Sequence, residues 1–169
     1  MELCTAAEVN RMLPKVSSQR REQALRFKHE HGRFCCLKSW LMLEELIGEP
    51  GDFLYNENGK PYLENKPYFS ISHCKEGIAV AVDNHPIGID IEAIRHAERD
   101  LIERVMNTNE RAGMDDRTFT RLWTQKEAVV KAEGVGIQSF EQLQNLLNNS
   151  EWRLKTVETE KYIYSIAYK

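Results

Sequence analysis

The 169-residue chain lacks three features that would assign it to broad classes of protein: long apolar runs, clustered cysteines and a strong net charge. No apolar stretch approaches the roughly 20 residues that a membrane-spanning helix needs. The N-terminus has neither the basic start nor the apolar core of a signal peptide. The net charge is only −3, which creates no general attraction for nucleic acids or anionic membranes. We therefore expect a cytoplasmic protein that binds neither.

Several sequence motifs are also missing. The four cysteines include no C-x-x-C pair, and two of them are adjacent within an expected helix; they are Cys4, Cys35, Cys36 and Cys74. This spacing predicts neither a disulfide framework nor a zinc site, and it fits a reducing compartment. P-loop and dinucleotide-binding fingerprints are absent, as is the G-x-S-x-G turn of many hydrolases.

Capping residues and apolar spacing predict alternating groups of helices and strands. A short helix follows Thr5 and stops near Pro14, and a longer helical segment begins at Ser17 or Ser18, with Gly32 as the expected point of division. Further helices are predicted at about 97–112, 117–133 and 140–146, and strands at 68–73, 78–82, 87–92, 152–157 and 162–168. A helix-then-strands order thus occurs before and after about residue 85, which predicts an α+β fold of two similar halves.

Two acids interrupt an isoleucine-rich strand in the stretch PIGIDIE. Because side chains alternate across a strand, the isoleucines face one side, while Asp90 and Glu92 face the other, roughly 7 Å apart. Like charges this close repel each other unless a cation lies between them, and Mg²⁺ prefers oxygen ligands. An edge strand with a solvated acidic face gives the same pattern, so the strand alone does not decide.

The predicted helix at 117–133 carries a third acid with two lysines. Trp123, Glu127 and Lys131 are spaced by four residues and share one face, and Lys126 lies one position around the helix. An exposed Glu127–Lys131 ion pair would be the ordinary interpretation. In the functional interpretation, Glu127 completes a three-carboxylate magnesium site and the two lysines neutralise a pyrophosphate.

Two weaker patterns lie earlier in the chain. Ser72 and His73 end a predicted strand beside a turn, where a hydroxyl and an imidazole can meet phosphate oxygens, although such pairs are more often structural. The stretch 58–61, Asn-Gly-Lys-Pro, has the composition of a turn, and its backbone and Lys60 could support a nucleotide.

Taken in order, these patterns resemble the 4′-phosphopantetheinyl transferase superfamily, in its larger, pseudo-dimeric branch that activates surfactin synthetase. The resemblance covers about residues 17–140. It rests on Gly59-Lys60-Pro61, Phe69-Ser70-Ile71-Ser72-His73, Gly88-Ile89-Asp90-Ile91-Glu92, and Trp123-Thr124-Gln125-Lys126-Glu127-Ala128 with Lys131 and Gly134. The last two motifs, in this order, make a specific pair, whereas either alone is only suggestive.

The resemblance implies a fold and an activity. The fold would be two pseudo-twofold-related halves, 1–85 with coenzyme A contacts and 86–169 with the metal-binding and catalytic residues, and the active site would lie between them. The activity would be the Mg²⁺-dependent transfer of the 4′-phosphopantetheine arm of coenzyme A to a serine of an apo-carrier protein, with release of 3′,5′-ADP. Mn²⁺ should substitute for Mg²⁺. Because one chain supplies both sides of the site, we expect an active monomer.

The resemblance also assigns roles to residues. Asp90, Glu92 and Glu127 match the metal ligands, and Glu127 and Lys131 match catalytic residues, with Glu127 as the general base. The positions that match coenzyme A contacts are Arg20, Lys60, Pro61, Ser72, His73, Asp90, Lys126 and Lys131. Gln23 stands where the family often has a lysine, and Phe34 where some members have a hydroxyl, so the contacts to the 3′-phosphate stay open.

Two other functions use the same residues. A Mg²⁺-dependent phosphodiesterase would use the three acids with water as the nucleophile, but a nuclease of this kind calls for a basic groove that the net charge does not favour. A non-catalytic module that binds coenzyme A or a carrier protein would be expected to have lost an acid or Lys131. The sequence does not identify the carrier, which could serve fatty-acid, polyketide or nonribosomal peptide synthesis.

Overall fold

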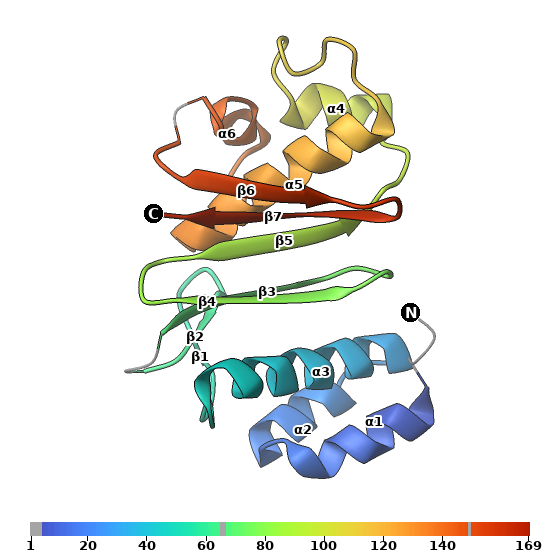
Figure 1. Cartoon of the computed structure of the whole chain (residues 1–169), viewed down its shortest axis with the longest axis vertical. Helices are drawn as coiled ribbons and strands as arrows, with labels where there is room; N and C mark the ends of the chain where they lie inside the picture. Colours follow the sequence, from blue (N-terminus) through green and yellow to red (C-terminus); the bar gives the residue numbers. More distant parts are fainter. Residues whose placement is uncertain (1–4, 65–66, 149) are drawn as a thin grey trace.

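The computed structural model describes residues 5–64, 67–148 and 150–169 (Figure 1). The first half of the chain contains α1 (Ala6–Met12), a 3₁₀ turn (Leu13–Lys15), α2 (Ser18–Leu25), α3 (Glu30–Ile47), β1 (Leu54–Tyr55), β2 (Pro61–Tyr62), β3 (Tyr68–His73) and β4 (Ile78–Asp83). The second half contains β5 (Gly88–Ala93), α4 (Arg99–Val105), α5 (Asp116–Glu133), α6 (Phe140–Asn145), β6 (Arg153–Glu158) and β7 (Tyr162–Tyr168). This mixture of helices and antiparallel strands confirms the predicted α+β class. No helix in the described part of the chain combines the length and apolar character that a membrane span requires.

Three helices begin at the predicted capping residues. The side chains of Thr5, Ser17 and Asp115 each accept a backbone N–H from the first turn of α1, α2 and α5, at 3.3, 3.2 and 2.7 Å. Gly134 ends α5 in the left-handed conformation, with φ of 73°, as expected of a glycine that follows a helix.

Two predicted helix boundaries are wrong. The long N-terminal helix divides at residues 26–29 rather than at Gly32, which lies inside α3. A Cβ at position 32 would stand 2.8 Å from Cδ1 of Phe27, so the glycine makes room for that ring. The helix expected at 97–112 ends at Val105, because Asn107 and Glu110 then bond to each other's backbone N–H groups and begin a series of turns.

The described strands form three antiparallel sheets, with the order β1–β2, β3–β4 and β5–β7–β6. Figure 1 shows α1, α2 and α3 together at one end of the molecule, below the β3–β4 hairpin. At the other end, α5 runs across the three-stranded sheet and contacts β5 and β7. The larger apolar core lies between α3 and the hairpin, and smaller ones lie around α5.

The two halves meet where β3 lies beside β5, and we call this junction the seam. Serine side chains join the two strands across it: the backbone N–H of Ile89 donates to Ser70 Oγ at 3.0 Å, and that of Ile91 donates to Ser72 Oγ at 3.3 Å. Both serines are buried. The polar face of the predicted β3 strand therefore connects the halves.

Gly88 allows α5 to approach β5 at backbone distance. A Cβ at this position would stand 1.9 Å from the carbonyl oxygen of Ala128 and 2.5 Å from the backbone nitrogen of Ala132. Only glycine fits there, and the close approach brings the polar face of α5 onto the acidic face of β5.

Candidate functional site at the seam

The three acids predicted as metal ligands lie around one cavity, and we call them the acidic cluster: Asp90, Glu92 and Glu127. The cavity has a volume of about 330 Å³, and Lys131 also lines it. Asp90 is only 3% exposed, because α5 covers its face of β5. β5 is an edge strand of its sheet, but the burial of Asp90 excludes the interpretation that its acidic face is solvated. All three of Trp123, Glu127 and Lys131 line the cavity, which confirms that they share one face of α5.

Asp90 is the centre of the polar contacts in this cavity. Its Oδ1 accepts from Lys131 Nζ at 2.6 Å and from Ser72 Oγ at 2.7 Å, and Lys131 Nζ also donates to Ser72 Oγ at 3.0 Å. Its other carboxylate oxygen, Oδ2, is buried and has no hydrogen-bond partner. A buried carboxylate oxygen without a partner is costly, so this atom indicates a missing ligand.

The charge of the cluster is only partly compensated. Burial raises the pKa of Glu92 and of Glu127, and the negative charge of Asp90 raises both further. Lys131 acts in the opposite direction on both groups but does not cancel these effects. An additional cation in the cavity would favour the ionised form of all three acids.

The donor set of this cavity fits a hard divalent cation. Three of its side chains offer carboxylate oxygens, which are the protein ligands that Mg²⁺ takes, and one of those oxygens lacks a partner. The three carboxylates are not a group of donors whose ligand atoms all lie within 4.8 Å of one another in the described part of the chain. Because Mg²⁺ usually keeps several waters, the three carboxylates need not all touch the ion.

A second cavity, of about 410 Å³, continues from the acidic cluster toward the β1–β2 turn. Glu127 and Lys131 line both cavities, and Lys60 and Pro61 form the far wall of the second. Burial lowers the pKa of Lys60. The predicted supporting turn and the acidic cluster therefore border one continuous surface.

A residue that sequence reasoning did not identify holds this turn in place. Asn56 Nδ2 donates to the carbonyl of Gly134 at 2.9 Å, and Lys60 Nζ donates to the carbonyl of Ala132 at 3.4 Å. The turn is thus attached to the C-terminal end of α5. The only sequence signal for this role is an asparagine just before a turn. Its Oδ1 accepts hydrogen bonds from the backbone N–H groups of Asn58 and Lys60 within that turn.

Arg20 and His73 line a smaller cavity of about 200 Å³ in the first half. Arg20 is buried: its guanidinium donates to the carbonyl of Cys36 at 3.0 and 2.7 Å and lies over the rings of Trp40 and Phe53. Burial lowers the pKa of His73, so its imidazole is neutral at neutral pH. An anion in this cavity can meet both residues, and His73 also lines the cavity of the acidic cluster.

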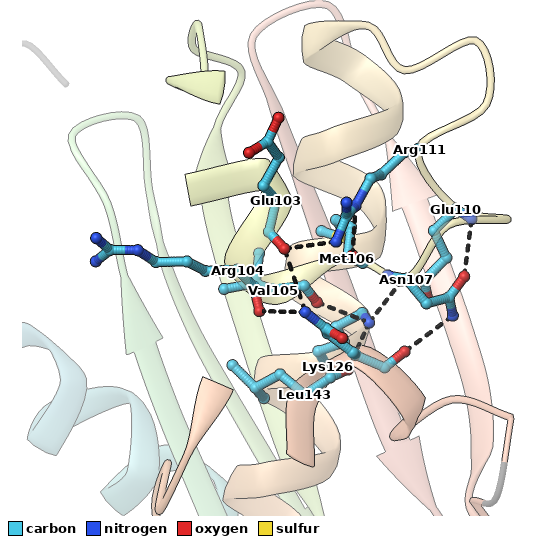
Figure 2. Close-up of polar contacts among 10 residues, drawn as sticks. Glu103, Arg104, Val105, Met106, Asn107, Glu110, Arg111, Lys126 and Leu143 are labelled. Carbon is cyan, nitrogen blue, oxygen red and sulfur yellow. Dashed lines mark hydrogen bonds and ion pairs between the residues drawn. The ribbon is translucent and has the colours of Figure 1, made fainter. Parts of the chain in front are cut away.

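The structure does not bring Lys126 to the acidic cluster. Its side chain is fully buried on another side of α5, where Nζ donates to the carbonyls of Val105 and Leu143 at 3.1 and 2.6 Å and to Glu110 Oε2 at 2.8 Å (Figure 2). The ammonium joins the end of α4, the following turn and α6. The pyrophosphate contact expected of Lys126 therefore has no support in this geometry. Lys126 directly precedes Glu127, so its side chain points to a different side of the helix.

A further cavity, of about 730 Å³, lies near α6 and the C-terminus. Its lining includes none of the residues predicted for the site, and we assign no chemistry to it.

Comparison with known proteins places these observations in a family. Residues 86–168 match the family model described as the 4′-phosphopantetheinyl transferase superfamily. A 4′-phosphopantetheinyl transferase of Bacillus subtilis is 32% identical over 149 residues, which cover 79% of this chain and 66% of the relative. The 4′-phosphopantetheinyl transferase gsp of Aneurinibacillus migulanus is 29% identical over 76% of this chain and 60% of its own length. AcpT of Salmonella typhi is 34% identical over 57% of this chain and 58% of its own length. The aligned part of the chain thus spans less than two thirds of each relative.

Proposed function

This chain belongs to the 4′-phosphopantetheinyl transferase superfamily, and on that basis we propose that it transfers the 4′-phosphopantetheine arm of coenzyme A to a serine of an apo-carrier protein. One observation carries the proposal. Glu127 and Lys131 line both the cavity of the acidic cluster and the adjoining cavity that the Lys60–Pro61 turn borders, so the groups suited to a metal-bound pyrophosphate adjoin a space suited to a nucleotide.

We place a magnesium ion on the acidic cluster, held by Asp90, Glu92 and Glu127. The unpartnered Oδ2 of Asp90 and the raised pKa of both glutamates support this assignment. When bound, the ion supplies Lewis-acid polarisation of the pyrophosphate and stabilises the leaving group. Mn²⁺ should substitute, because it also prefers oxygen ligands.

Coenzyme A would lie along the seam, with its nucleotide against Lys60 and Pro61 and with phosphates toward His73 and Arg20. Lys131 supplies a positive charge to this arrangement. Its side chain is 29% exposed, is held by Asp90 and lines both cavities. Its ammonium would offset charge that develops on the phosphate oxygens in the transition state.

In the chemical step, the serine oxygen of the carrier forms a bond to the β-phosphorus of coenzyme A, and the bond to 3′,5′-ADP breaks. The serine proton moves to Glu127, the one acid of the cluster that lines both cavities. Ser72 positions Asp90 through its 2.7 Å hydrogen bond. Lys126 belongs to the scaffold behind the site.

Mass spectrometry of candidate apo-carriers incubated with coenzyme A, Mg²⁺ and this protein tests the proposal. We expect a mass gain equal to one phosphopantetheine on the carrier, and its loss with Glu127→Gln. The matched control is Glu160→Gln, on the exposed β6–β7 turn, which should keep the activity. Hydrolysis of coenzyme A with no modified carrier would favour a phosphodiesterase instead.

We also propose that residues 1–85 and 86–169 form the two halves of the enzyme, and that one chain is active alone. The support is that β3 and the β1–β2 turn supply one side of the cavities, and β5 and α5 supply the other. Light scattering should show an active monomer. A stable oligomer whose activity disappears on dilution would contradict this.

A further inference from the structure

A group of nitrogen and sulfur donors lies on the first-half side of the seam, and one of its members, His73, also lines the cavity of the acidic cluster. Its members are His31 and Cys35 on α3 and His73 at the end of β3, and their ligand atoms all lie within 4.8 Å of one another. Cys35 Sγ and His31 Nε2 are 3.6 Å apart, and the two imidazole rings meet edge to face. Cysteine spacing alone could not indicate this group, because its third member lies on a different element.

These distances match the geometry of a tetrahedral metal site. With Zn–S of about 2.3 Å and Zn–N of about 2.0–2.1 Å, a sulfur and a nitrogen on one tetrahedral ion are about 3.5 Å apart. The Cys35–His31 pair already has this separation. His31 and Cys35 are four residues apart on α3, so they share one face of the helix. The ligand atom of His73 lies within 4.8 Å of the other two, and it completes three ligands when it approaches them.

We propose that His31, Cys35 and His73 form a binding site for a thiophilic divalent transition metal ion, with Zn²⁺ as the representative. One sulfur and two nitrogen donors suit such an ion, whereas Mg²⁺ prefers oxygen, so this site and the acidic cluster select different metals. Three protein ligands leave the fourth position open. Cys35 and His73 line the cavity that also contains Arg20, which gives an ion access from solvent.

The site has a consequence that rests on the proposed function. If His73 contacts a phosphate of coenzyme A, a metal ion that binds its imidazole removes that contact. Zn²⁺ should then act as an inhibitor that competes with coenzyme A rather than with Mg²⁺.

Titration of the chelator-stripped full chain with Co²⁺ tests the site without any activity measurement. We expect one equivalent of Co²⁺ to give a thiolate-to-cobalt charge-transfer band that disappears in Cys35→Ser, whereas Co²⁺ on the acidic cluster, which offers no sulfur, gives no such band. Because Cys35 is a core residue, His31→Gln serves as a second variant, verified by circular dichroism, and should lower Co²⁺ affinity by about tenfold or more. Cys74→Ser and Asp90→Asn are matched controls and should keep the band. A band that survives Cys35→Ser, or the absence of stoichiometric binding, would overturn the proposal.

A kinetic measurement then tests the inhibition. Zn²⁺ should raise the KM for coenzyme A in the unsubstituted chain and leave it unchanged in His31→Gln. Equal inhibition of both proteins would place the inhibitory ion elsewhere and overturn the competition at His73. If Co²⁺ binds as expected but no carrier is modified, the metal site stands and the proposed transferase function fails, so the two failures are distinguishable.

Discussion

Replacement of Lys126 by methionine separates its structural role from a role in coenzyme A binding. The change keeps a long apolar side chain but removes an ammonium that is 0% exposed and donates three hydrogen bonds (Figure 2). It leaves two backbone carbonyls without their partner and Glu110 without its counter-ion. Breaking a buried ion pair from one side typically costs about 3–5 kcal/mol. We therefore expect the free energy of unfolding to fall by about 3–5 kcal/mol, a large share of the 5–15 kcal/mol that stabilises most domains.

Urea denaturation measures this loss, and two further variants sharpen it. Lys155→Met, at an exposed position on β6, should change stability by less than about 0.5 kcal/mol. Adding Glu110→Gln to Lys126→Met should recover part of the loss, because no buried charge then lacks a partner. The folded fraction of Lys126→Met should keep the KM for coenzyme A. A stability change below about 1 kcal/mol together with a raised KM would refute the structural role and restore Lys126 to the site.

Three other predictions follow from the same geometry. Gly88→Ala should lower the free energy of unfolding by at least about 1–3 kcal/mol in thermal or urea unfolding, because its Cβ would overlap the backbone of α5. Gly77→Ala should cost less, because its Cβ meets only the end of the Ile91 side chain. Equal losses in the two variants would contradict the close packing of α5 on β5. Asp90→Asn should lower the transfer rate by about two orders of magnitude or more while circular dichroism stays native, and near-normal activity at saturating Mg²⁺ would contradict the metal assignment. His73→Ala should raise the KM for coenzyme A more than it lowers kcat, whereas a lower kcat at constant KM would instead indicate a part in the chemistry.

The sequence predicts the acidic cluster because the side-chain directions in a strand and in a helix depend only on local spacing. The alternation of side chains along β5 placed Asp90 and Glu92 on one face, and helical spacing placed Glu127 and Lys131 on one face of α5. Gly88 then explains why the two faces meet. The sequence motif contains this glycine, but only the structure shows that a side chain there would overlap the helix backbone.

The contacts that the sequence did not predict depend on what packs against each element. Lys126 differs from Glu127 by one position, and no local rule indicates that α4 and α6 would surround it with carbonyl groups. The Asn56 side chain donates a hydrogen bond to the carbonyl of Gly134, which is far away in the chain. A glycine at position 32 predicts a helix break, but in the structure it lies within α3 against the ring of Phe27. In each case the partner is distant in sequence or lies on a turn that propensity does not position.

Ser72 connects the stability of the seam to the electrostatics of the site. Its hydroxyl has one proton and two lone pairs, and all are used: it donates to Asp90 Oδ1, and it accepts from the backbone of Ile91 and from Lys131 Nζ. One of the two serine hydroxyls that join β3 to β5 therefore also orients the carboxylate and its counter-ion. A displacement of one half against the other would break all three bonds of Ser72 together. It follows that docking of the two halves orients Asp90 and Lys131, although both residues lie in the second half.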